Sequence, residues 1–377
     1  MRCWRMLQMV GCSLWVTIAS ACPFCNVVGR PLAQQRDEAA VVAIAESLAA
    51  AVAGDDGLLQ QPWRIDQVIR GRPDLGGSVV TAHVGASAEG TGVLFGEGIV
   101  GEPLRWTAVL ADEAVLGYVV AVPAWEAPPA ERLPWFARRL EHPDPVIAED
   151  AYTEFGLAPF AAVRAAAAAL DAAKLMAWVA EPGIDQRRRG LYGLLLGLVA
   201  SQTHDAMIRT AAISGLHNAI EMPANDFRSG FDGLMGGVLV AEGVAGLDYL
   251  EGLGLAGPAG RPVDQRHLLS ALRFAWEFLG DEIPRERISR ATARLLAAPA
   301  VAADAVIDLA RQQAWGDADA VAALWESLGD DDPLVRRAVA GYLTACPLPA
   351  ASRLLEHIRG RDPERLDAAI EAARLPR

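Results

Sequence analysis

Lysine is almost absent from this chain, because Lys174 is the single lysine among 34 basic residues. The basic residues are outnumbered by 47 acidic ones, which gives a formal net charge of −13 over 377 residues. A nucleic-acid-binding surface needs clustered cations that neutralise the phosphate backbone. The charge balance therefore excludes nucleic acid as the expected partner.

Long hydrophobic runs are also missing beyond the N-terminus. The best candidate, residues 191–200, is much shorter than the roughly 20 residues that a membrane-spanning helix needs. We therefore expect no membrane span in this part of the chain. A composition of 52% hydrophobic and 21% charged residues is typical of a globular protein, and the length predicts two domains.

Cysteine is scarce and unevenly placed. Only Cys346 lies in the body of the chain, and we expect it to be a buried thiol at a helix end. The other four cysteines fall within the first 25 residues: Cys3, Cys12, Cys22 and Cys25. The N-terminal segment is therefore the part of the chain in which cysteine chemistry is expected.

The first 21 residues have the layout of a secretory signal peptide. Arg2 and Arg5 give a positive start, residues 6–18 are mostly apolar, and Ala19-Ser20-Ala21 matches an A-x-A cleavage site. Cleavage there makes Cys22 the first residue of an exported protein of the periplasm or cell envelope. A lipid anchor on Cys22 is the alternative, although Ala19 stands where a lipobox has a larger aliphatic residue.

The motif Cys22-Pro23-Phe24-Cys25 allows more than one role. In an oxidising compartment the two thiols can form a local disulfide, and a C-x-x-C pair can also carry out thiol–disulfide exchange. Asn26 stands where a haem attachment motif has histidine, and no second cysteine or histidine pair completes a zinc site. We expect no cofactor and no bound metal, and we keep Cys22 and Cys25 as disulfide or redox candidates.

Residues 22–125 predict a small β domain. Short β-branched or alternating apolar segments are separated by turns rich in glycine and proline, and a segment of helical spacing closes the domain. Five strands in about a hundred residues suit a small barrel of the OB type, and a short sandwich fits nearly as well. The expected strands are 41–45, 63–70, 78–84, 93–95 and 105–110, and the closing helix is 112–122.

Residues 126–377 are expected to be helical. Two prolines at 128 and 129 form a stiff linker, and the chain beyond them is rich in alanine and leucine. Asp-Pro pairs at 144, 332 and 362 predict helix starts, because aspartate caps a helix N-terminus and proline fits its first turn. The expected fold class is α+β, with a small N-terminal β barrel followed by an all-α solenoid.

Several stretches of the helical region carry a family resemblance. DDDPLVRRAVAGYL at 330–343 resembles the second helix of a HEAT repeat. The chain after residue 21 is similar to an uncharacterised family of exported bacterial proteins, through its ACPFC start and through DAYTEF, RRRGLY, IPRERI and YLTACPLP, which begin at 150, 187, 283 and 342. The resemblance implies a β domain followed by a HEAT-like α-solenoid, an architecture that usually serves as a binding scaffold.

The β domain also resembles a netrin-type module, the fold of tissue inhibitors of metalloproteases. The resemblance rests on Cys22, on residues 41–45 and on WRIDQVIRGRPDLGG at 63–77. In those inhibitors the first cysteine binds the protease zinc through its terminal amine and carbonyl, which implies the same role for Cys22. This chain departs from the family in having C-x-x-C where the family has C-x-C, and it lacks the later partner cysteines.

Further binding candidates lie in the helical region. Arg187, Arg188 and Arg189 are consecutive cations that can grip carboxylates across a concave face. Trp135 and Trp178 are residues of the kind that anchors protein interfaces. We predict no catalytic residue, because the six histidines are scattered and the G-x-G-x-x-G at 96–101 does not open a helix.

These observations predict an exported, non-enzymatic scaffold that binds a protein of the cell envelope through its solenoid surface. Two alternatives remain open. One is a thiol-redox or metal-linked accessory protein that uses Cys22 and Cys25. The other is a protease inhibitor that uses the Cys22 terminus. They differ from the scaffold in whether these cysteines matter for anything beyond stability.

Overall fold

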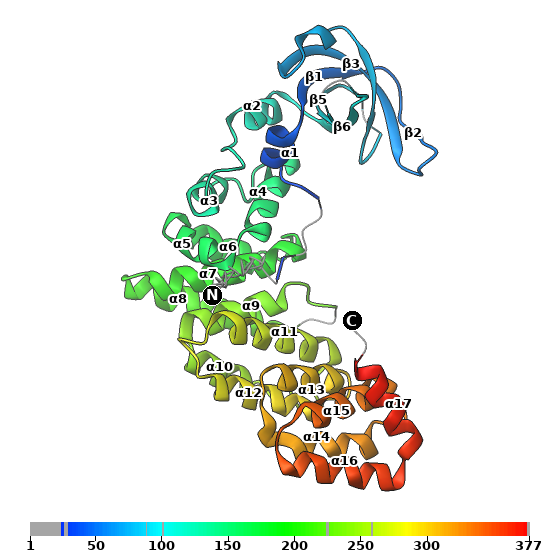
Figure 1. Ribbon diagram of the computed structural model, residues 1–377. Helices are drawn as coiled ribbons and strands as arrows, with labels where there is room; N and C mark the ends of the chain where they lie inside the picture. Colours follow the sequence, from blue (N-terminus) through cyan, green and yellow to red (C-terminus); the bar gives the residue numbers. More distant parts are fainter. Residues whose placement is uncertain are drawn as a thin grey trace, which may run out of the picture.

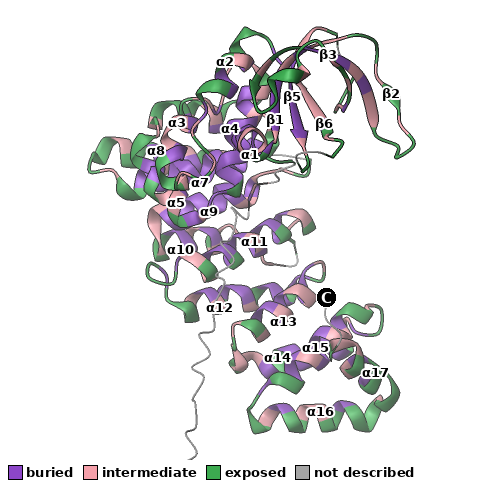
Figure 2. Ribbon diagram, turned by 45° about the horizontal axis from the view of Figure 1, so that its top comes forward, coloured by how far each residue is buried: buried purple, intermediate pink, exposed green. Residues whose placement is uncertain are grey.

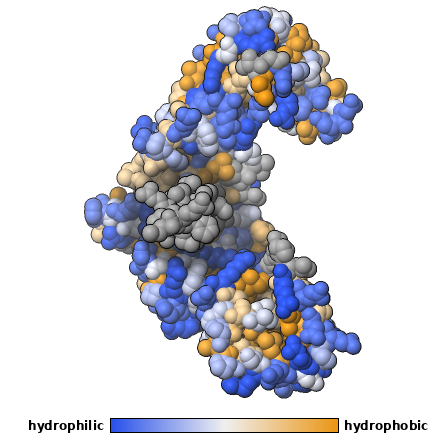
Figure 3. Space-filling view, viewed as in Figure 1, coloured by the Kyte–Doolittle hydropathy of each residue, from blue (hydrophilic) through white to orange (hydrophobic). Residues whose placement is uncertain are grey.

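The computed structural model describes residues 24–25, 29–87, 89–99, 102–223, 226–257 and 259–374. The chain forms an arc, with a β barrel at one end and a curved stack of helices that continues to the C-terminus (Figure 1). The barrel and the last helices face each other across a hollowed side of the molecule (Figure 3). The predicted signal peptide and Cys22 lie outside the described residues.

The β region is a closed five-stranded barrel with one extra short strand. Its strands follow the order β1-β5-β6-β4-β3, and a pairing of β1 with β3 closes the ring. All neighbours are antiparallel except β4 and β6. This closure confirms the predicted barrel and excludes the sandwich. The strands are β1 (Val41–Ser47), β3 (Leu59–Arg70), β4 (Val79–His83), β5 (Thr91–Glu97) and β6 (Arg105–Leu110), with β2 (Val52–Ala53) added to β3.

Two tryptophans fill the barrel because glycines stand opposite them. Trp63 is fully buried, and a Cβ placed on Gly92 would lie 2.8 Å from its ring. Trp106 pairs with Gly96 across β5 and β6, and a Cβ on Gly96 would lie 2.8 Å from that ring. The alternation seen at WRIDQVIR thus places Trp63 and Ile65 inside the barrel.

Two helices connect the barrel to the rest of the chain. The closing helix was predicted, and it forms as α2 (Glu113–Ala121), with the Asp112 side chain accepting a hydrogen bond from the Val115 amide. The helix α1 (Leu32–Glu38) was not predicted, because the segment LAQQRDE is short and its N-terminal side chains make no cap. Both pack beside α4 (Pro145–Leu157) of the helical region (Figure 1).

The remaining helices, α3 to α17, form what we call the solenoid. The predicted starts are confirmed, since Asp144 caps α4 and Asp332 caps α15 through side-chain hydrogen bonds, and proline follows each. The helices are α3 (Pro129–Ala137), α4 (Pro145–Leu157), α5 (Phe160–Ala165), α6 (Ala172–Ala180), α7 (Gln186–Gln202), α8 (Ala206–Glu221), α9 (Phe231–Glu242), α10 (Val244–Gly252), α11 (Pro262–Phe278), α12 (Arg285–Arg294), α13 (Ala302–Arg311), α14 (Ala318–Ser327), α15 (Pro333–Ala345), α16 (Pro349–Arg361) and α17 (Pro363–Arg374).

Burial is concentrated in the middle of the solenoid. Figure 2 shows buried residues over most of α7 and α9, whereas α16 near the C-terminal end is largely exposed. Every residue from Gly190 to Ala200 is buried, which explains why this stretch has no hydrophilic face. In the described part of the chain, α7 and its neighbours all fall short of the length and apolarity needed to cross a membrane.

Candidate binding site

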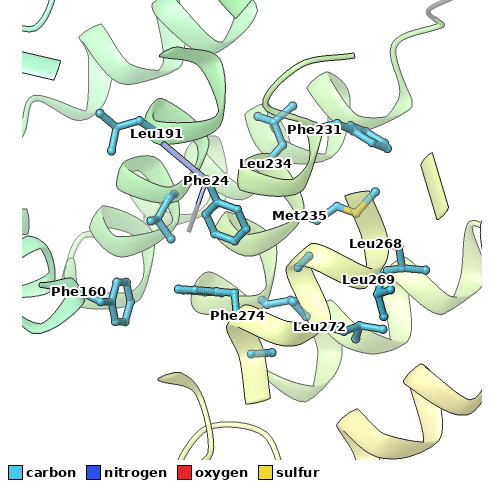
Figure 4. Packing of buried hydrophobic residues seen from close by; sticks show 14 of the residues in the cluster. Phe24, Phe160, Leu191, Phe231, Leu234, Met235, Leu268, Leu269, Leu272 and Phe274 are labelled. Carbon is cyan, nitrogen blue, oxygen red and sulfur yellow. The ribbon is translucent and has the colours of Figure 1, made fainter. Parts of the chain in front are cut away.

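Phe24 of the C-P-F-C motif packs inside the solenoid. Its side chain is 7% exposed, and its ring centroid lies 4.9 Å from that of Phe274 on α11. Figure 4 shows the ring among side chains of α5, α7 and α11, including Phe160 and Leu191. Gly236 on α9 makes room for it, since a Cβ there would lie 2.6 Å from the Phe24 ring. The segment beside the predicted cysteine pair is therefore anchored in the helical core.

Of the two cysteines in the motif, Cys25 lies within the described residues and Cys22 does not. Cys25 is half-buried and lines a cavity of about 400 Å³ on the solenoid. Cys22 falls outside the described residues, so the disulfide, the redox pair and the lipid anchor stay predictions. Cys346 is buried near the end of α15, as expected. Among the described residues, no three His, Cys, Asp or Glu side chains are grouped so that they could hold a metal ion.

The cavity beside Cys25 combines cations with aromatic rings, and we call it the basic hollow. It lies where the N-terminal segment meets the starts of α7, α9 and α11. Its lining has three potentially cationic side chains and one carboxylate. The lining residues are Phe24, Cys25, Arg187, Phe227, Ser229, Gly230, Asp232, Arg266 and His267.

His267 is a buried imidazole in the wall of this hollow. Burial by itself lowers its pKa, but the hydrogen bonds with the Asp232 carboxylate and the Phe227 carbonyl outweigh this effect and raise the pKa above its usual value. Nε2 lies 3.0 Å from the Phe227 oxygen, and Nδ1 lies 3.6 Å from Asp232. Because a carbonyl can only accept, Nε2 donates. Both ring nitrogens thus face protein acceptors, so His267 is not placed as a base for the Cys25 thiol.

The three consecutive arginines point to different surroundings, because successive residues of a helix are rotated by about 100°. Arg187 pairs with Asp185 at 2.8 Å, and its side chain is still 44% exposed. Arg188 is buried and pairs with Glu149 at 2.8 Å and Glu141 at 3.3 Å. Arg189 donates to the Glu181 carbonyl at 3.0 Å and lines a separate cavity. Of the three, only Arg187 lines the basic hollow.

A second cavity, of about 630 Å³, adjoins Arg187 on its other side. It lies between the barrel and the solenoid, since Val109 of β6 and Arg30 before α1 line it together with Pro145 of α4. Arg187 therefore stands between two cavities, and at least the second opens where barrel and solenoid meet.

The two predicted tryptophans pack against neighbouring rings. Trp135 lies 5.1 Å from the ring of Tyr118, and the Arg139 guanidinium stacks over it at 3.4 Å. Trp178 lies 5.0 Å from the ring of Tyr192. Neither lines the basic hollow, so the structure does not bring them together with Arg187 and Cys25.

A buried polar cluster at the barrel junction was missed by sequence reasoning. Asp150 on α4 accepts hydrogen bonds from the Leu32 amide at 2.6 Å and from the Tyr118 hydroxyl at 2.5 Å. One turn later, Glu154 pairs with the buried Arg132 at 2.9 Å. Burial raises the pKa of Asp150, and it raises that of Glu154 to about 7 in spite of Arg132. The i, i+4 spacing of the two acids in DAYTEF is a signal that could have indicated this cluster.

The cluster fixes the barrel to the solenoid. Asp150 serves as an external cap for α1, whose own N-terminus lacks a side-chain cap. Tyr118 brings in α2 through the other carboxylate oxygen. One buried side chain of α4 therefore holds both helices that flank the barrel.

Comparisons with protein-family models, with curated proteins and with solved structures gave no match to this chain.

Proposed function

We propose that the protein is an exported, non-enzymatic scaffold that binds a protein partner of the cell envelope at the basic hollow. The observation that carries this proposal is the exposed Arg187, which lies between a cavity of about 400 Å³ and one of about 630 Å³. We also propose that the helices are HEAT-like repeats and that the barrel is netrin-like. In such an assembly a curved stack of helices presents one continuous surface to a partner.

The surroundings of Cys25 support binding over catalysis. One common way to activate a thiol as a nucleophile is a general base with a nitrogen available within hydrogen-bonding reach. His267, the histidine that lines the hollow, already engages Phe227 and Asp232 through its two nitrogens. The hollow thus offers charge and shape without a base for the thiol.

A thiol-redox role is the second candidate, and one observation favours it. Arg187 and Arg266 line the same cavity as Cys25, and nearby cations stabilise a thiolate. The inhibitor alternative has less support, because an inhibitor terminus has to enter a protease cleft. Here Phe24 is instead packed within the protein's own helices.

The binding proposal is tested with a photo-activated cross-linking amino acid at Phe227, which is 61% exposed at the rim of the hollow. The matched control position is Met207 at the start of α8, which is 82% exposed and lines none of these cavities. We expect one defined adduct in the envelope fraction from position 227 and none from 207. Equal labelling at both positions, or none at either, contradicts the proposal.

Export is tested separately by the intact mass and N-terminal sequence of the protein recovered from its native cells. We expect a protein that begins at Cys22, with the mass of either a plain or a lipidated terminus. A protein that keeps residues 1–21 contradicts export, and an added lipid mass selects the anchored form.

A further inference from the structure

The basic hollow differs in charge from the protein that surrounds it. The whole chain has a formal net charge of −13, whereas Arg187, Arg266 and His267 line the hollow against Asp232 alone. An excess of positive charge within an acidic surface directs anionic groups to one place. The residues that line the hollow therefore favour a negatively charged ligand.

The three basic side chains are not equally available to a ligand. His267 faces Asp232, and the charge of Arg187 is shared with Asp185 and Glu149. Arg266 is exposed on α11 and has no ion-pair partner among the described residues. Its guanidinium is the cation that a ligand can neutralise.

An apolar contact lies beside these charges. The side chain of Phe227 is 61% exposed, although its ring lies 5.1 Å from that of His267. A large exposed aromatic side chain next to a pocket is a common anchor for a partner's apolar residue. Ser229 and Gly230 complete this side of the wall.

We propose that the basic hollow binds an acidic, extended segment of a protein partner. One Asp or Glu side chain of that segment pairs with Arg266, and a neighbouring apolar side chain packs on Phe227. The planar guanidinium matches a carboxylate through two parallel hydrogen bonds, which gives direction as well as charge. This inference rests on the proposed scaffold function and names its ligand chemistry.

A long polyanion is a poorer fit than a short acidic segment. Among the described residues, two arginines and His267 are the basic side chains that line the hollow, and the net charge of −13 repels further phosphates within about a Debye length of 8 Å. A segment that presents one or two carboxylates avoids that repulsion. The charge of the chain thus limits the ligand's size.

The test measures fluorescence anisotropy of the purified full chain with a labelled peptide of alternating glutamate and phenylalanine. We expect saturable binding that weakens as salt rises, and at least a tenfold loss of affinity for Arg266→Glu. The matched control is Arg290→Glu, an exposed arginine of α12 that lines no cavity described above. We expect this variant to stay within about twofold of the parent protein. Circular dichroism confirms that both variants are folded.

Three results would overturn the inference. They are equal binding of a peptide with glutamine in place of glutamate, equal losses for the two arginine variants, and displacement of the peptide by millimolar inorganic phosphate. The last would show a general anion site.

The peptide-binding test and the cross-linking test can fail independently of each other. A partner that still cross-links at position 227 in Arg266→Glu leaves the scaffold standing and refutes the acidic ligand. Specific peptide binding without any cross-linked partner supports the hollow and refutes the scaffold.

Discussion

The middle and the C-terminal end of the solenoid are held together in different ways. In the middle, α7 and α9 approach so closely that a Cβ on Gly197 would lie 2.2 Å from the Gly237 carbonyl oxygen. At the C-terminal end, α15 and α17 begin with proline, and α15 is capped by Asp332. There a Cβ on Gly360 of α16 would meet no atom within 4 Å.

The difference shows which helices depend on direct contact between their backbones. Asp185 still caps α7 by accepting a hydrogen bond from the Arg187 amide, but Gln186 and three arginines stand where an Asp-Pro start would continue with proline. Glycine spacing brings the two backbones together, and Gly236 leaves space for Phe24. The contact between α7 and α9 depends on the absence of side chains at particular glycines, whereas Gly360 at the C-terminal end has open space beside it.

The largest expected effect comes from Gly197→Ala. The new methyl group would meet backbone atoms of Gly237, which can move only if α7 and α9 separate. We expect a loss of about 3 kcal/mol or more of unfolding free energy, measured by urea unfolding followed by circular dichroism. Gly360→Ala is the matched control, and we expect it to stabilise the protein by up to about 1 kcal/mol. Similar results for the two variants would refute the contrast between the regions.

Phe24→Ala tests whether the N-terminal segment belongs energetically to the middle of the solenoid. Removing a buried phenylalanine side chain costs about 3 kcal/mol in a closed core. We expect a loss near this value and faster hydrogen exchange at the amides of α9 and α11. Leu334→Ala is the control, because Leu334 is 60% exposed on α15. A Phe24 variant as stable as this control would show that the segment only rests on the surface.

The sequence was sufficient for most of the elements, α1 and β2 excepted, and insufficient for the site. Strands such as 105–110 and helix starts such as Asp332-Pro333 depend on local patterns, and the structure confirms both. Phe24 offered no local signal, because its partner Phe274 lies 250 residues away in the chain. Arg266 and His267 likewise become part of a site only because α11 packs against residues of α7 and α9 that are distant in the sequence. Long-range packing, which no local pattern encodes, creates the hollow.

The barrel junction is a third kind of region, held by buried polar groups, and pH tests it. The pKa of Glu154 rises from an ordinary 4.5 to about 7 in the folded state. The folded protein therefore binds more protons than the unfolded chain between these values, so this group's contribution to stability falls as pH rises from 4.5 to 7. We expect the parent protein to lose up to about 3 kcal/mol relative to Glu154→Gln over this range. A constant difference between the two proteins across that range would contradict the shift.

The smallest expected effect concerns the C-terminal end of the solenoid. Asp332 accepts a hydrogen bond from the Leu334 amide at 2.8 Å, so Asp332→Ala leaves that amide without its cap. We expect a loss of about 1 kcal/mol of unfolding free energy, whereas Asp332→Asn keeps the acceptor and most of the stability. The neighbouring Asp331→Ala is the control, since Asp331 is exposed and caps no helix, and it should change stability by less than about 0.5 kcal/mol. If Asp332→Ala cost as much as Gly197→Ala, the end of the solenoid would depend on single atoms as strongly as the middle does, and the two regions would no longer differ in kind.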